Sequence, residues 1–191
     1  QRRHQKIIEE APSPLVAAQT YPDLWPQLRE ASIKLASAAG YVNAGTVEFM
    51  VDDATGAFYF LEVNARLQVE HPVTESITAL DLVRLQLLVA QGEKLDLAAN
   101  LALGERNAIS GHAVEARIVA EDPARNFLPS IGRIVGWAEP QGPGIRVDTG
   151  YGAGAEVSRF YDSLLAKVIA HGATRGEAIA RLIAALEDFH I

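Results

Sequence analysis

Apolar and polar positions repeat with two different periods along this chain, and the periods separate expected helices from expected strands. Three segments carry apolar residues at helical spacing, beginning at Leu24, Thr78 and Thr174. Glycine is a natural helix stop, so the first two helices are expected to end at Gly40 and Gly92. Thr78 and Thr174 each precede an acidic residue by three positions, as in an N-terminal capping box. These boxes predict where the second and third helices begin.

Short apolar or alternating runs, bounded by turn residues, predict β-strands between these helices. The expected strands are residues 1–10, 41–51, 57–64, 111–120, 133–138, 145–149 and 164–171. Turn residues 52–56 join two of these strands as a hairpin. Beyond Ala108 the pattern changes to short strands and glycine turns. We therefore expect two domains, residues 1–108 and 109–191.

Composition narrows the class of protein. The 191 residues are 49% hydrophobic and 21% charged, which is ordinary for a globular chain of one domain or two small ones. No apolar run is long enough to span a bilayer, so no membrane association is expected. The absence of cysteine excludes disulfides and thiolate metal sites. The net charge of −7, without a basic stripe, argues against nucleic-acid binding.

The most informative stretch begins where a buried strand gives way to polar side chains on a two-residue period. Glu62 and Asn64 share one face of the strand, and Arg66, Gln68 and Glu70 continue that spacing if the backbone stays extended. Each residue alone is more simply explained as the end of a strand that runs into a charged loop. Buried charges are costly unless they are paired or bind a metal, so the set as a whole predicts a functional site.

A further carboxylate is expected to join this group. Glu48 lies in an otherwise apolar strand and faces Glu62 and Asn64 if the hairpin pairs. A lone glutamate in a strand is usually a residue at the rim. Two carboxylates and an amide carbonyl, however, are hard oxygen ligands that suit Mg²⁺ or Mn²⁺ held together with substrate phosphates. The hairpin therefore predicts a metal site.

These residues belong to a series of ordered motifs that resembles the biotin carboxylase family. The matching stretches are residues 1–6, 45–49, 62–75, 111–118, 120–123, 127–130 and 161–163. The resemblance implies an α+β fold: the C-terminal lobe of an ATP-grasp fold, with an antiparallel sheet and helices, followed by a small β-rich C-terminal domain. In the family this subunit or domain serves acetyl-CoA, propionyl-CoA, methylcrotonyl-CoA, pyruvate and urea carboxylases.

The resemblance implies an ATP-dependent ligase that carboxylates biotin on a carrier protein. ATP and bicarbonate would give carboxyphosphate with the help of two Mg²⁺ or Mn²⁺ ions, and the biotin ureido nitrogen would then take the carboxyl group. The implied partners are a biotinyl carrier domain and a carboxyltransferase, either as a subunit or as a domain. Another copy of the chain would bind through the C-terminal domain, around residues 143–146, to form a homodimer. The implied location is the cytoplasm, or the mitochondrial matrix in a eukaryote.

The resemblance also implies roles for individual residues. ATP would contact Gln1, His4, Glu48 and Glu62, and the metal ligands would be Glu48, Glu62 and Asn64. Bicarbonate would be bound by Lys6, Arg66, Gln68, the backbone N–H of Val69, and Glu70. Glu70 would be the general base. Arg117 would stabilise the biotin enolate, although an internal ion pair with Glu115 is a structural alternative.

Two other functions stay open. One is another bicarbonate-using ATP-grasp ligase, such as half of a carbamoyl-phosphate synthase; the motif of residues 115–123 favours the biotin enzyme. The other is a non-catalytic dimerisation module, which would not require Arg66, Glu70 and Arg117 together. The family supplies its phosphate-covering glycine loop and adenine hinge from a region before the one matched here. We therefore expect this chain to be the C-terminal half of the enzyme and inactive alone.

Overall fold

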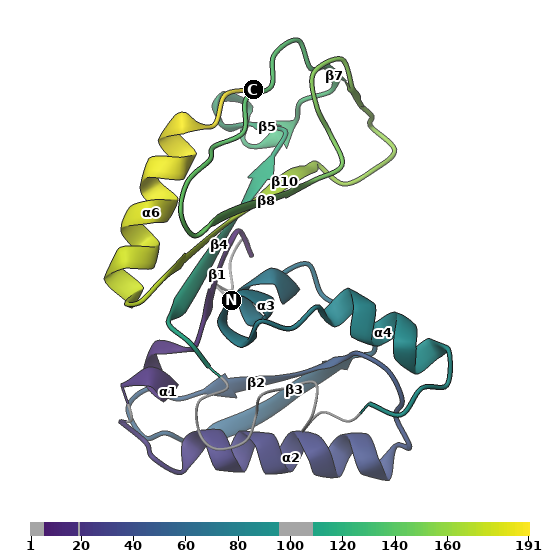
Figure 1. The fold of residues 1–191 in the computed structure, drawn as a ribbon, viewed down its shortest axis with the longest axis vertical. Coiled ribbons are helices and arrows are strands. Elements are labelled where there is room, and N and C mark those ends of the chain that lie inside the picture. Colours follow the sequence, from purple (N-terminus) through teal and green to yellow (C-terminus); the bar gives the residue numbers. More distant parts are fainter. Residues whose placement is uncertain (1–5, 19, 96–108) are drawn as a thin grey trace. The chain divides into compact units, whose positions relative to one another are not determined.

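The computed structural model describes residues 6–18, 20–95 and 109–191, and these divide into two compact units (Figure 1). The sheet unit contains the described residues up to Ala11 together with Ser110 to Ile191. The hairpin unit contains the described residues from Pro12 to Ile109. The first strand of the chain belongs to the sheet unit, whereas the predicted domains, 1–108 and 109–191, place it in the N-terminal domain. The domain limits themselves stay a prediction. Within the described residues, no helix has the length and apolar character needed to cross a membrane.

The sheet unit is built on four antiparallel strands in the order β1-β4-β10-β8. Their bounds are Ile8–Ala11 for β1, His112–Val119 for β4, Leu164–Gly172 for β10 and Ile145–Thr149 for β8. Helix α6, Arg175–Asp188, lies against one face of this sheet (Figure 1). The buried residues between them are Val114, Ala116, Val168, Ala170, Ala178, Leu182 and Ala185. Alternate residues of β4 and β10 therefore form one apolar face, because the side chains of a strand point alternately to its two faces.

Helix α6 begins where its capping box predicts. The Thr174 side chain accepts a hydrogen bond from the Glu177 backbone N–H at 3.2 Å. The Glu177 carboxylate accepts one from the Ala173 backbone N–H at 2.8 Å. These contacts satisfy backbone donors that the first helical turn leaves unpaired. The alanines and leucine of its buried stripe then fit closely against the small residues of β4 and β10.

The remaining strands of this unit are short. They are β5 (Glu121–Asp122), β6 (Leu128–Pro129), β7 (Gly132–Arg133) and β9 (Glu156–Val157), with a 3-10 turn at Pro123–Arg125. The predicted strand 133–138 is mostly wrong, because β7 ends at Arg133 and Ala138 forms only an isolated bridge to His190. Its apolar residues pack individually instead: Ile134 enters a small core while Val135 is 93% exposed.

The described residues of the hairpin unit form two antiparallel strands and four helices. The bounds are Pro14–Ala17 for α1, Leu24–Ala38 for α2, Thr46–Val51 for β2, Phe58–Asn64 for β3, His71–Thr78 for α3 and Leu82–Ala90 for α4. The predicted hairpin is confirmed, and Glu48 lies opposite Glu62 in its register. Phe49 packs edge-on against Phe58 and Phe60, and these aromatic contacts hold the two strands together next to the Glu48–Glu62 pair.

The helix predicted from Thr78 to Gln91 begins later than expected, and another helix precedes it. Thr78 ends α3, Ala79 adopts a left-handed backbone conformation, and Asp81 is the N-cap of α4. The Asp81 side chain accepts from the Arg84 backbone N–H at 2.8 Å. The buried Glu75 carboxylate accepts from the Leu82 N–H at 2.7 Å, so a side chain of α3 satisfies the start of α4. The local Thr78 pattern could not reveal that contact.

The packing of α6 makes a testable prediction about the stability of the sheet unit. Leu182→Ala should lower the free energy of unfolding by about 2 to 5 kcal/mol, because Leu182 is 5% exposed and its loss leaves a cavity. Leu186→Ala is the matched control; Leu186 is 36% exposed and should cost clearly less. Trp137, which packs on Phe189 just after α6, can report urea unfolding by fluorescence in a Trp25→Phe background. Equal losses in both variants would contradict this assignment of the core.

Candidate functional site

The predicted metal-ligand side chains come together on the β2–β3 hairpin. Glu48 and Glu62 occupy opposite positions of the strand pair, so both carboxylates project from the same face. The Asn64 side-chain amide donates to Glu48 Oε1 at 2.8 Å and to Glu62 Oε1 at 3.3 Å. The Gln68 amide donates to the same Glu48 oxygen at 3.0 Å. The hairpin therefore gathers two carboxylates and two amides at one place, and their role as ligands stays a prediction.

The chemistry of this donor set fits a hard divalent cation. Neighbouring carboxylates repel each other, and here two neutral amide groups supply the partial positive charge that offsets the repulsion. A cation between Glu48 and Glu62 would do so more strongly, and rotation of the Asn64 amide would present its oxygen as a further ligand. Across the described residues, no group of three or more His, Cys, Asp or Glu side chains is arranged to hold a metal. A metal here would therefore complete its shell with phosphate oxygens and water.

The extended spacing expected for Arg66, Gln68 and Glu70 does not hold. Strand β3 ends at Asn64, Arg66 lies at an exposed bend, and Glu70 sits in a turn as the N-cap residue of α3. The chain turns here because α3 begins at His71, and the His71 N–H bonds back to the Gln68 carbonyl at 3.3 Å. The backbone therefore does not stay extended from Asn64 to Glu70, and a common bicarbonate site for these three residues stays a prediction. Their binding of bicarbonate rests on the resemblance alone.

The predicted site residues outside the hairpin unit have different placements. Lys6 lies in the sheet unit, exposed and with a positive φ of 51°. Arg117 lies on β4 of the same unit. Gln1 and His4, predicted to contact ATP, lie outside the described residues. In the hairpin unit, Val69 precedes Glu70 in the turn before α3 and is half-buried.

Arg117 belongs to a charged face of the four-stranded sheet. The sheet register places Glu9 opposite Glu115, and Arg117 opposite Lys167, on the face turned away from α6. The Arg117 Nη2 atom lies 2.8 Å from Glu9 Oε1, an ion pair that joins β4 to β1. The ion pair with Glu115, which the sequence offers as a structural alternative, stays a prediction. Glu9 is not among the site residues predicted from the sequence, although an acidic residue beside apolar strand positions is a signal of a buried charge.

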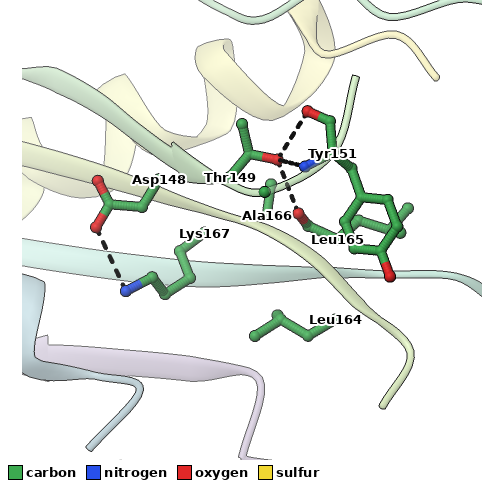
Figure 2. A pocket seen from close by; sticks show the side chains of 8 residues that line it. Asp148, Thr149, Tyr151, Leu164, Leu165, Ala166 and Lys167 are labelled. Atoms are coloured by element: carbon green, nitrogen blue, oxygen red, sulfur yellow. Dashed lines mark hydrogen bonds and ion pairs between the residues drawn. The ribbon is translucent and has the colours of Figure 1, made fainter. Parts of the chain in front are cut away.

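A cavity of about 310 Å³ lies on β8 and β10 close to this charged face. Figure 2 shows Lys167 and Asp148 pointing toward each other at its edge, with 3.4 Å between Lys167 Nζ and Asp148 Oδ2. Thr149 Oγ1 donates to the Leu165 carbonyl at 2.9 Å and accepts from the Tyr151 N–H at 2.9 Å. Among the residues that the structure describes, none of those predicted to bind ATP, metal or bicarbonate lines this cavity.

Asp148 also binds Arg146 through two hydrogen bonds, of 2.7 and 2.8 Å. Burial raises the pKa of Asp148, but the hydrogen bond and charge of Arg146, with a smaller contribution from Lys167, outweigh this effect and leave the pKa below its ordinary value. Asp148 therefore stays ionised and keeps both cations on β8 and β10 paired.

Two family models match the chain. The first is the carbamoyl-phosphate synthase L chain ATP-binding domain, over residues 1–98, and the second is the biotin carboxylase C-terminal domain, over residues 115–191. A pyruvate carboxylase subunit of Methanothermobacter thermautotrophicus is 48% identical, and the match covers 100% of this chain and 37% of that protein. Biotin carboxylase 1 of Bacillus subtilis is 46% identical, with 100% and 40% covered. The chain thus spans about two fifths of the length of these relatives.

Solved structures agree with these matches. The biotin carboxylase domain dimer of Hydrogenobacter thermophilus 2-oxoglutarate carboxylase, in complex with MgADP, ADP and bicarbonate, has a TM-score of 0.87 and 41% identity. That match covers 100% of this chain and 40% of the other. Rhizobium etli pyruvate carboxylase gives a TM-score of 0.89 and 41% identity, covering 100% and 18%. The antiparallel sheets with helices seen here are therefore the arrangement found in biotin carboxylase domains.

The lowered pKa of Asp148 predicts how stability depends on pH. A carboxyl group with a lower pKa in the folded state stabilises the fold above its unfolded pKa, and the contribution is lost as pH falls through the folded pKa. Asp148→Asn should therefore lower the melting temperature at pH 7, and the difference from wild type should shrink as the pH falls below about 4. Glu187→Gln, at an exposed position of α6, is the control and should follow wild type at both pH values. A difference that does not change with pH would contradict the prediction.

Proposed function

The chain belongs to the biotin carboxylase family, and on this basis we propose that it supplies the metal- and bicarbonate-binding part of an ATP-dependent ligase that carboxylates biotin on a carrier protein. The observation that carries the proposal is the meeting of Glu48, Glu62 and Asn64 on the hairpin. This group lies within the region matched by the ATP-binding family model. The match of residues 115–191 to the biotin carboxylase C-terminal domain favours this function over the carbamoyl-phosphate synthase alternative.

Glu48, Glu62 and Asn64 would hold the Mg²⁺ or Mn²⁺ ions. When bound, these ions offset the charge of the triphosphate and orient its terminal phosphate. The protein contributes by keeping two carboxylates at cross-strand distance on a paired hairpin, which prevents them from moving apart. The amides of Asn64 and Gln68 support this arrangement by donating to Glu48.

Bicarbonate would be captured by Arg66, Gln68, Lys6 and the Val69 N–H. A guanidinium can bind a planar anion with two parallel hydrogen bonds, and the exposed Arg66 side chain is available from the bend after β3. Gln68 uses one amide N–H for Glu48, and its second N–H suits an anion. Glu70 would accept the bicarbonate proton, so that the resulting dianion attacks the γ-phosphate of ATP.

Carboxyphosphate then splits into CO2 and phosphate, and the phosphate can deprotonate biotin. Arg117 would stabilise the negative charge that develops on the ureido oxygen, by a positive charge already in place. The carboxyl group on biotin would pass to a carboxyltransferase, either a subunit or a domain. Another copy of the chain is proposed to bind near residues 143–146, which lead into the edge strand β8. Location in the cytoplasm or the mitochondrial matrix stays a prediction.

The proposed function and the role of Glu70 as the general base can be tested in one experiment. A biotin carboxylase that contains this chain should carboxylate free biotin with ATP, Mg²⁺ and bicarbonate. Glu70→Gln should lower kcat by about a hundredfold to ten-thousandfold, because general-base help is worth that much. The exposed Glu93→Gln is the control and should keep wild-type kinetics.

Two outcomes would count against this prediction. A wild-type enzyme without biotin-dependent turnover would remove the proposed function. A Glu70→Gln enzyme with near-normal kcat at saturating bicarbonate, and a raised KM for bicarbonate, would show that Glu70 orients the anion site instead of accepting a proton.

A second prediction concerns the metal. Glu62→Gln should raise the Mg²⁺ concentration needed for half-maximal activity, because one of the two anionic ligands is lost. Electron paramagnetic resonance of Mn²⁺ in the presence of ATP should show weaker binding, independently of turnover. Asp53→Asn, in the exposed turn of the same hairpin, should leave both measurements unchanged. Unchanged Mn²⁺ binding in Glu62→Gln would rule out Glu62 as a ligand.

A further inference from the structure

Two almost fully buried carboxylates lie next to each other on the charged face of the sheet. Glu9 on β1 is 2% exposed and Glu115 on β4 is 0% exposed, and the strand register places them directly opposite. Like charges at such positions destabilise a strand pair, and burial makes each ion costly unless a cation or hydrogen-bond donors accompany it. The arrangement therefore depends on the cations that lie beside these two residues.

Arg117 is one such cation, and β1 and the residue before it hold Arg117 at two points. Its Nη2 atom lies 2.8 Å from Glu9 Oε1, and its backbone N–H donates to the Ile7 carbonyl at 2.9 Å. The side-chain exposures of the pair are 17% for Arg117 and 1% for Glu9. The carboxylate is thus the more deeply buried member of the ion pair.

A second cation restricts the direction in which Arg117 can lie. Lys167 on β10 is directly opposite Arg117, so the two positive side chains repel each other. Lys167 Nζ is drawn toward β8, where Asp148 Oδ2 lies at 3.4 Å (Figure 2). Arg117 is drawn the other way, toward β1. The carboxylates that attract these two cations, Glu9 and Asp148, thus lie on opposite sides of the β4–β10 pair, which draws the two positive charges apart.

We propose that Glu9 is the positioning residue for Arg117, whose guanidinium it fixes in the direction that meets the ureido oxygen of biotin. This inference rests on the proposed function. A charge that stabilises a developing oxyanion acts best when it is already oriented, since no reorganisation is then needed during the reaction. Glu115, two residues from Arg117 on the same strand and face, offers the guanidinium a second buried carboxylate. Glu9 therefore matters for direction, because removal of its charge changes the balance of attractions that act on the guanidinium.

The test compares adjacent glutamates on β1 in a biotin carboxylase that contains this chain. Glu9→Gln removes the charge but keeps the shape of the side chain. It should lower kcat/KM for carboxylation of free biotin by about tenfold to a hundredfold, as is typical when the partner that orients a functional group is lost. Bicarbonate-dependent ATP cleavage without biotin should stay within about twofold, because Arg117 acts only on biotin. Arg117→Ala removes the guanidinium itself and should therefore lower biotin carboxylation more than Glu9→Gln does.

Glu10→Gln is the matched control. Glu10 is the next residue of β1, points to the opposite face and binds Arg175 with 2.6 Å between Glu10 Oε2 and Arg175 Nε. This variant makes the same chemical change in the same strand and should keep both activities. If Glu9→Gln and Glu10→Gln behave alike, or if Glu9→Gln lowers ATP cleavage as much as biotin carboxylation, the proposal is overturned.

A measurement without turnover separates this inference from the proposed function. Side-chain nitrogen NMR of Arg117, assigned with Arg117→Lys, should show an ordered guanidinium in wild type and in Glu10→Gln. The signal should shift or broaden in Glu9→Gln as the guanidinium leaves its position. An unchanged Arg117 signal in Glu9→Gln would overturn the positioning role even if activity fell. A wild-type enzyme that shows the expected NMR response but does not carboxylate biotin would instead overturn the proposed function.

Discussion

Repulsion between carboxylates that lie opposite each other in an antiparallel strand pair is the constraint on which both units depend. In the hairpin unit the pair is Glu48 and Glu62, and in the sheet unit it is Glu9 and Glu115. Neither arrangement is stable without positive charge or hydrogen-bond donors beside it. The chain meets this requirement differently in the two units, and the difference matches the chemistry proposed for each.

The hairpin relieves the repulsion with neutral groups. Asn64 and Gln68 donate amide hydrogens to the carboxylates, and Glu62 is exposed, so water also screens the charges. Neutral donors offset the repulsion only in part, and such a site gains most from a divalent cation. The sheet unit uses cations of its own. Glu9 and Glu115 are buried, where water cannot screen them, and Arg117 pairs directly with Glu9.

The two faces of the four-stranded sheet differ: one packs against α6, and the other carries Arg117, the residue proposed to act on biotin. Residues that point toward α6 are small and apolar, and they pack closely around Val168 and Ala170, both 0% exposed. Because side chains alternate between the two faces of a strand, Glu115 and Arg117 of β4 and Lys167 of β10 point to the other face. The close packing against α6 makes the apolar face rigid. A rigid strand is a suitable support for an oriented guanidinium on its other face.

The sequence by itself determined the features that depend on neighbours along the chain. Strand periodicity and a five-residue turn were enough to place Glu48 opposite Glu62, and the Thr174 capping box was enough to place the start of α6. The order of motifs was enough to identify the family. Only the tertiary structure decided that β1 pairs with β4, and hence that Glu9 meets Arg117 across 108 positions of sequence. It also decided that β3 ends at Asn64. Local hydrogen bonds and periodicity leave a trace in the sequence, whereas the pairing of distant strands is chosen by burial and charge that form only when the chain has folded.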